Sequence, residues 1–173
     1  KFVGGQKTYV DLTPHVGKFD RLMSGSITLW VKTTRSTGGA IVMVGATNKQ
    51  SAKKIQIYLQ SGRVYYEVVG DLPTGGTING FTDVADDLWH HVALTVSPSG
   101  FATIYVDGSL ETSGQEGFFG HVLGLNGMWM GRLQFRNPSR HFHGQLDDVA
   151  IWGRELTVSE VVNLASMPPP LAP

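Results

Sequence analysis

The chain has 173 residues, and its 14 lysines and arginines balance 14 aspartates and glutamates. This length is typical of one domain, and the net charge of zero excludes the uniformly basic surface of a nucleic-acid-binding protein. Charged residues make up only 16% of the chain and there are 22 glycines, a composition that favours short strands and tight turns over long surface helices. Without cysteine the chain has no disulfide and no thiolate metal site, and no apolar run approaches the roughly 18 residues of a membrane span.

The balanced charge hides a segregation along the chain. Residues 21–66 contain seven lysines and arginines and no acidic residue. Residues 67–116 contain eight acidic residues and no lysine or arginine, and residues 117–146 contain three arginines and again no acidic residue. The sequence therefore predicts local charged surfaces that the net charge does not reveal.

Short segments of alternating polar and apolar residues recur along the chain. Ile27, Leu29 and Val31, for example, share one face of an extended segment, because successive side chains of a strand point to opposite faces. The same pattern predicts strands at 26–32, 40–44, 54–60, 63–69, 90–96, 102–106, 128–133 and 145–152. Ser61-Gly62 and Asp107-Gly108 are typical of the tight turns of β-hairpins. Together these features predict an all-β protein, a two-sheet antiparallel β-sandwich of the jelly-roll type.

The end of the chain has a helical signal. Thr157 and Glu160 have the spacing of a capping box, in which each side chain accepts from the free backbone N–H of the other residue. One short C-terminal helix is therefore predicted, ending at about residue 165. Residues 167–173 contain three successive prolines, which neither extend a helix nor pair in a sheet. We expect one folded domain at 1–166 and a proline-rich linker at 167–173 that joins it to neighbouring domains of a larger protein.

Three segments of the chain together resemble one known family. They are FVGGQKTYVDL followed by GSITLWVKTT near the start, DLWHHVALTVSPSGFATIYVDGSL in the middle, and HGQLDDVAIWGRELTVSEV near the end. The chain resembles the laminin-G-like jelly rolls of the concanavalin A-like lectin/glucanase superfamily, which also includes the pentraxins. The resemblance implies the sandwich fold, in which that superfamily holds lectins, adhesion modules and glycoside hydrolases. It also implies that Trp30, Trp89 and Trp152 are packing residues.

Catalytic patterns are missing from the sequence. A retaining glycosidase needs two carboxyl groups roughly 5–5.5 Å apart, and on one strand this requires acidic residues two positions apart. The chain contains no such Asp/Glu-x-Asp/Glu pair and no Gly-x-Ser-x-Gly motif. His141 and His143 could offer two imidazoles to zinc, but no third protein ligand is evident. We therefore expect a protein that is not an enzyme.

One carboxylate of the last predicted strand is a candidate metal ligand. Asp147 alternates with Val149 and Ile151, so its carboxylate is predicted to point inward, where it needs a bound cation or a set of backbone N–H groups. The resemblance implies the first alternative, one structural calcium ion beside Asp147. A pentraxin-type pair of calcium ions is not expected, because the matching stretches 46–54 and 132–137 contain no carboxylate.

Basic residues stand where that calcium pair would be. Arginine side chains bind carboxylate, sulfate or phosphate through two parallel hydrogen bonds, so a cluster of these residues is suited to anions. The alternative is that they are ordinary solvated loop tips. The resemblance implies that the two groups share one face, the first formed by Lys49, Lys53 and Lys54 and the second by Arg132, Arg136, Arg140, His141 and His143.

These observations favour a non-catalytic binding module of a larger extracellular or cell-surface protein. Its expected partner is a glycan or glycoprotein, with acidic glycans favoured because of the basic residues. The alternative is a lectin-like fold used as a protein-adhesion module or spacer without a sugar site, and a glycoside hydrolase is a third hypothesis. Neither nucleic-acid binding nor membrane insertion is expected.

Overall fold

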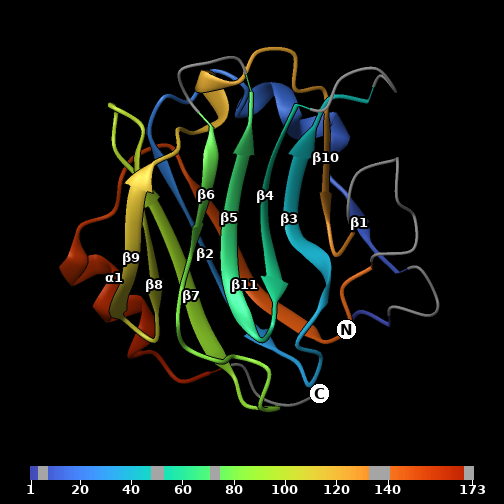
Figure 1. Cartoon of the computed structure of the whole chain (residues 1–173), viewed down its shortest axis with the longest axis vertical. Helices are drawn as coiled ribbons and strands as arrows, with labels where there is room; N and C mark the ends of the chain where they lie inside the picture. Colours follow the sequence, from blue (N-terminus) through green and yellow to red (C-terminus); the bar gives the residue numbers. More distant parts are fainter. Residues whose placement is uncertain (4–7, 48–52, 71–74, 133–140, 170–173) are drawn as a thin grey trace.

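The computed structural model describes residues 1–3, 8–47, 53–70, 75–132 and 141–169. Two antiparallel sheets stack face to face and form a β-sandwich (Figure 1), which confirms the predicted fold. The six-stranded sheet has the order β1 (Val10–Asp11), β10 (Gly127–Met130), β3 (Gly38–Gly45), β4 (Lys54–Gln60), β5 (Arg63–Val69) and β6 (Gly76–Asn79). The five-stranded sheet has the order β11 (Gln145–Trp152), β2 (Gly25–Lys32), β7 (His90–Val96), β8 (Phe101–Val106) and β9 (Ser109–Gln115).

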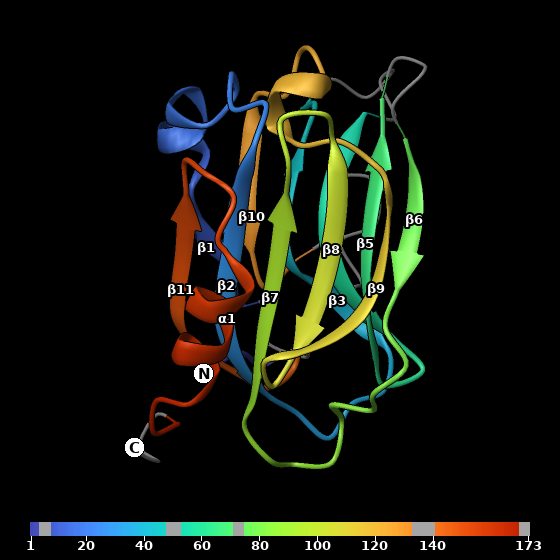
Figure 2. The same ribbon diagram turned by 90° about the vertical axis from the view of Figure 1, so that its left-hand side faces the viewer.

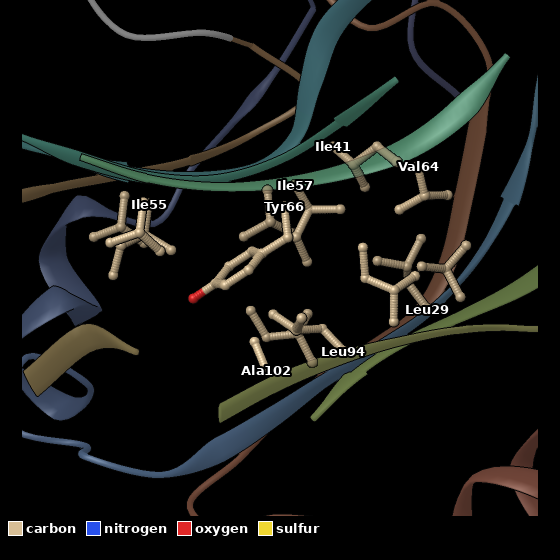
Figure 3. Packing of buried hydrophobic residues seen from close by; sticks show 14 of the residues in the cluster. Leu29, Ile41, Ile55, Ile57, Val64, Tyr66, Leu94 and Ala102 are labelled. Carbon is tan, nitrogen blue, oxygen red and sulfur yellow. The ribbon is translucent and has the colours of Figure 1, made fainter. Parts of the chain in front are cut away.

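Alternation along the strands builds one core between the sheets. Leu29 of β2 and Leu94 of β7 meet Ile57 of β4 and Tyr66 of β5, all with at most 2% of their surface exposed (Figure 3). The Tyr66 hydroxyl donates a hydrogen bond to the carbonyl of Gly117 at 2.7 Å, so its burial leaves no orphaned polar group. Each such side chain contributes roughly 1.5–3 kcal/mol when it is fully buried, so this core holds the sheets together.

Both predicted hairpin turns are present. Ser61 and Gly62 have φ angles of 52° and 75°, and Asp107 and Gly108 have φ angles of 50° and 78°. Two successive positive φ angles are typical of the type I′ turn, whose twist matches that of the flanking strands. The alternation pattern missed β1 and β6, because strands of two and four residues carry too little of it, and also the seven-residue β9, whose sequence SLETSGQ has a single apolar side chain.

The short helix α1 (Val158–Ala165) also forms as predicted. The Glu160 N–H donates to the Thr157 hydroxyl at 3.3 Å, and the Thr157 N–H donates to the Glu160 carboxylate at 2.9 Å. This capping box starts the helix, which lies over the outer face of the five-stranded sheet (Figure 2). Leu156 and Val161 pack there against Ala93 and Tyr105 in a second apolar cluster.

Tryptophans complete the covered face of the five-stranded sheet. Trp30 is 7% exposed and packs edge-on against the ring of His91, with 5.4 Å between ring centroids. Trp152 packs against the cluster under α1, and its Nε1 donates to the Thr28 hydroxyl at 3.1 Å. Trp89 is half-buried. The outer face of the six-stranded sheet differs, because no α-helix of the described residues lies over it (Figure 1).

Candidate functional site

The predicted basic residues separate to the two ends of β3. Lys54 pairs with Gly45 at the end of this strand, whereas the N–H of Gly131, just before Arg132, donates to the Ile41 carbonyl near its beginning. These two points of β3 are four residues apart, a distance of about 13 Å along a strand. The structure therefore separates Lys53 and Lys54 from Arg132 along β3, and the shared anion-binding cluster of these residues stays a prediction.

Strand direction is the reason for this separation. Strands β10 and β3 are antiparallel, so the chain that leaves β10 emerges where β3 begins. The connection that contains Lys53 follows the other end of β3. Lys49, Arg136 and Arg140 lie outside the described residues.

Lys54 belongs to a polar network on the outer face of the six-stranded sheet. Its Nζ lies 2.7 Å from a carboxylate oxygen of Glu67, and the amide nitrogen of Gln56 donates to the same oxygen. Gln56 is 5% exposed, and its Oε1 has no hydrogen-bond partner in the described part of the chain. The ammonium group of Lys54 thus already neutralises an acid on this face, and the face retains an unsatisfied acceptor beside it.

Arg132 lies between two aromatic rings on the same outer face. Its Cζ lies 4.5 Å from the ring centroid of Tyr9 and 4.9 Å from that of Trp129, the geometry of a cation–π contact on each side. His141 pairs with Arg132 across an isolated β-bridge, and its ring centroid lies 6.3 Å from that of Tyr9. We call Tyr9, Trp129, Arg132 and His141 the arginine surface.

Strand pairing explains how the arginine surface forms. Met128 and Met130 point into the core, so Trp129 points outward from the short strand between them. Its strand β10 lies next to β1, which follows Tyr9 directly. The sequence analysis found Arg132 and His141 but missed Tyr9 and Trp129. The alternation of residues 128–130 predicts that Trp129 points away from the core, and this pattern could have indicated it as a site residue.

An acidic residue also stands at the arginine surface. Asp11 pairs with Trp129 between β1 and β10, and it accepts a hydrogen bond from the Thr13 N–H at 2.9 Å. Hydrogen bonds from Thr13 lower the pKa of Asp11, with a smaller lowering from the charge of Arg132. Asp11 is therefore ionised at neutral pH, and its negative charge attracts the Arg132 guanidinium to its position beside the two rings.

Asp147 does not point inward as predicted. It is exposed, and its Oδ1 accepts a hydrogen bond from the N–H of Asp148 at 2.9 Å. The pairing of β11 with β2 shifts register between Asp147 and Ala150, and Asp148 there has a φ of 47°. This β-bulge inserts one residue into the alternation, so Asp147 lies on the outer face although Val149 and Ile151 still pack on the core.

A structural calcium ion was expected because an inward carboxylate needs a compensating charge. An exposed carboxylate needs no cation to compensate its burial, so the position of Asp147 does not by itself require a calcium ion. The described residues contain no group of three or more histidine and acidic side chains that could hold a metal ion. The calcium ion therefore stays a prediction, and nothing below depends on it.

Two neighbouring histidines begin β7 and have opposite environments. His90 lies 2.7 Å from Asp107 through Nδ1 and 3.1 Å from Asp86 through Nε2. Burial opposes the charged imidazole, but the two carboxylates outweigh it and raise the pKa of His90. His91 is 3% exposed, and burial lowers its pKa. His90 is thus held between two carboxylates and His91 is buried beside Trp30, so both have structural roles.

A family comparison identifies the fold group. The model described as the concanavalin A-like lectin/glucanases superfamily, of laminin-G type, matches residues 4–162. The chain belongs to this superfamily. Within it, the chain is similar to the Rattus norvegicus protein named sushi, von Willebrand factor type A, EGF and pentraxin domain-containing protein 1, with 32% identity over 93 residues. The match covers 50% of this chain, and the chain spans about 3% of the length of the curated relatives it matches.

Solved structures of the same fold include sugar complexes. The CBM40 domain of the Ruminococcus gnavus IT-sialidase bound to α2,3-sialyllactose has a TM-score of 0.78 at 17% identity, covering 92% of both chains. Domain 4 of AbnA, an extracellular arabinanase of Geobacillus stearothermophilus in complex with arabinotriose, has a TM-score of 0.61 at 23% identity, covering 86% of this chain and 70% of that one. At these identities the likeness shows that the superfamily member described here has the jelly-roll fold. Among its described residues, no helix has the length and apolar character needed to cross a membrane.

Proposed function

We propose that this superfamily member is a non-catalytic glycan-binding module whose ligands are acidic glycans. The arginine surface carries the proposal, because it holds the Arg132 guanidinium between the rings of Tyr9 and Trp129. Such stacking fixes the planar fork of N–H donors before a ligand arrives, so less conformational entropy is lost on binding. A carboxylate or sulfate of a sugar is the anion that this planar fork binds through two parallel hydrogen bonds.

The aromatic side chains supply the second requirement of sugar binding. Tyr9 is 43% exposed, so part of its ring is available to the apolar C–H face of a sugar. Gln56 lies two strands from Trp129, about 10 Å away across the sheet, but its amide oxygen is buried, so Tyr9 is the more accessible part of this face. The fold likeness to domains solved with sialyllactose and arabinotriose supports the choice of a glycan.

The described carboxylates near the arginine surface support binding rather than catalysis. Glu67 is paired with Lys54, and Asp11 accepts from Thr13, whose hydrogen bonds lower the pKa of Asp11. A general acid of a glycosidase needs the opposite, a raised pKa that keeps its proton at neutral pH. We also propose that the module is part of a larger extracellular or cell-surface protein, the context in which glycans are displayed.

A glycan array with three proteins tests this function. The wild type is expected to bind sialylated or sulfated glycans, and Arg132→Gln is expected to lose that signal. Arg21→Gln is the matched control, because Arg21 is an exposed arginine outside the arginine surface. Raising the salt concentration should weaken the signal steeply, because exposed charge pairs are screened within about 3 Å at 1 M.

The same array carries the outcomes that contradict the proposal. A flat response with all glycans, together with measured affinity for a protein, would support the adhesion or spacer hypothesis instead. Salt-insensitive binding, or equal binding by the wild type and Arg132→Gln, would exclude the arginine surface as the site. Repeating the array with a calcium chelator separates this site from any calcium-dependent one.

A further inference from the structure

A polar pocket lies at the rim of the sandwich, where β2 ends and β11 begins. It has a volume of about 160 Å³, the share of roughly five water molecules in the liquid. Its lining residues include Lys32, Thr33, Thr34, Asp87, His143 and Gln145. We call it the rim pocket. It shares no residue with the arginine surface.

Two opposite charges face each other across the rim pocket without a direct hydrogen bond. The Nζ of Lys32 lies 4.0 Å from the Oδ1 of Asp87, beyond the 2.7–3.2 Å of a protein N–H···O hydrogen bond. Neither side chain has a hydrogen-bond partner within the described ranges. All three N–H donors of the Lys32 ammonium and both oxygens of the Asp87 carboxylate are therefore available to hydrogen-bond a ligand.

This spacing selects a particular ligand chemistry. A hydroxyl group between the two side chains accepts from the Lys32 ammonium and donates to the Asp87 carboxylate at the same time. A simple cation meets repulsion from Lys32 and from Lys1, which also lines the pocket, and a simple anion meets repulsion from Asp87. The exposed hydroxyl of Thr34 and the amide of Gln145 add further partners for a ligand with several hydroxyls.

The backbone of Asp87 is held in position before any ligand binds, and its side chain is 64% exposed. Its backbone N–H donates to the Thr33 carbonyl at 3.0 Å, and its φ of 68° is a conformation that few residues other than glycine adopt. The preceding Asp86 accepts from Leu88 and from His90, and His90 in turn contacts Asp107. A residue with a strained backbone that hydrogen bonds of its own and of neighbouring residues hold in place is typical of a preorganised binding position.

The rim pocket lies close to the arginine surface along one chain segment. His141 belongs to the arginine surface and His143 lines the rim pocket, so their Cα atoms are at most about 7 Å apart. Phe142 between them is buried in the core, which anchors the segment. Two adjoining sugar rings can span such a distance.

We propose that the rim pocket is a second sugar subsite, which binds a neutral, hydroxyl-bearing unit through Lys32 and Asp87. This inference rests on the proposed function, because the acidic unit of the same glycan would occupy the arginine surface. The ligand is then an oligosaccharide with an acidic unit next to a neutral one. The neutral unit contributes affinity of its own.

Nuclear magnetic resonance titrations with lactose and 3′-sialyllactose test the subsite. In the wild type, lactose should shift the backbone amides of Thr33, Thr34 and Asp87, and 3′-sialyllactose should also shift those of Tyr9 and Arg132. Lys32→Met and Asp87→Gly should each lose the lactose shifts and weaken 3′-sialyllactose about tenfold. Glycine tolerates the positive φ at position 87, so this variant removes the carboxylate without new backbone strain.

The controls distinguish failure of the subsite from failure of the function. Lys18→Met removes an exposed lysine of the 3₁₀ helix Thr13–Lys18 and should match the wild type. If Arg132→Gln abolishes 3′-sialyllactose binding while Lys32→Met and Asp87→Gly leave it unchanged, the rim pocket is not a subsite but the proposed function stands. If lactose shifts no amide of the rim pocket, the inference is likewise wrong. If no variant changes binding, both proposals fail.

Discussion

The outer faces of the two sheets carry similar aromatic residues but use them differently. On the five-stranded sheet, Trp30 is buried beside His91, and α1 packs against Ala93 and Tyr105. On the six-stranded sheet, Tyr9 and Trp129 hold a cationic side chain, and no α-helix of the described residues lies over them (Figure 1). Both tryptophans are buried, Trp30 at 7% and Trp129 at 5% exposed, so the two faces differ in the partner of the indole, which is the His91 ring on one face and the Arg132 guanidinium on the other.

Replacing Trp30 by alanine should have the largest effect and should act on stability alone. Loss of a buried tryptophan typically lowers the free energy of unfolding by about 3–5 kcal/mol, through lost burial and a residual cavity. Denaturant unfolding measures this change, and titration of the folded fraction should give the wild-type glycan affinity. A loss of glycan affinity in the folded fraction would show that Trp30 also contributes to binding, so the two faces would not differ in function.

Ser26 links the covered face to the segment that precedes α1. Its buried hydroxyl accepts from the Leu156 N–H at 2.9 Å and donates to the Arg154 carbonyl at 3.1 Å. Ser26→Ala leaves a buried donor unsatisfied, so the free energy of unfolding should fall by about 1–3 kcal/mol. Ser113→Ala, at an exposed position of β9, is the control and should change stability by less than about 0.5 kcal/mol. Equal effects of the two variants would show that the segment is not fixed by this contact.

Variants of Tyr9 test the role of the aromatic rings on the six-stranded sheet. Tyr9→Ala removes one of the two rings that hold Arg132, a cation–π contact worth about 0.5–1 kcal/mol at an exposed site. Glycan affinity should fall by a factor of about two to five, with little change in unfolding. Tyr9→Phe keeps the ring and should bind like the wild type. A Phe variant as weak as the Ala variant would assign the effect to the hydroxyl group instead.

The pH dependence of stability should come in part from the five-stranded sheet. The folded-state pKa of His90 is raised, so its contribution is complete below about pH 6.5 and is lost as pH rises through the folded-state pKa. The lowered pKa of His91 acts in the opposite direction, because its contribution is complete above about pH 6.5 and is lost as pH falls through the lowered folded-state pKa. Asp86→Asn should remove about 0.2–1 kcal/mol at pH 6 and less at pH 8, as measured by unfolding at both pH values. An equal loss at both would show that the contact does not depend on the imidazolium.

The sequence predicted most of the fold because the fold follows from local rules. Alternation marked the long strands other than β9, Ser61-Gly62 and Asp107-Gly108 marked the hairpins, and Thr157 with Glu160 marked the helix start. Each of these signals lies within a few residues of the feature it predicts. The strand β1 has only two residues, which is too short to show an alternation of polar and apolar side chains.

The site was less predictable because it depends on pairings distant in sequence. The arginine surface joins Tyr9 to Arg132, which are 123 positions apart, through the pairing of β1 with β10. The separation of Lys54 from Arg132 follows from strand direction, which alternation does not encode. Asp147 was placed on the wrong face because a single bulged residue reverses the alternation.

The central claim is that Arg132 recognises the acidic group of a glycan. Calorimetric titration of the wild type and Arg132→Gln with 3′-sialyllactose and lactose tests it most directly, because the two ligands differ by one acidic sugar. We predict that the wild type prefers 3′-sialyllactose by tenfold or more, about 1.4 kcal/mol, and that Arg132→Gln binds both ligands equally. A preference that persists in Arg132→Gln would contradict the account, because another group would then recognise the carboxylate.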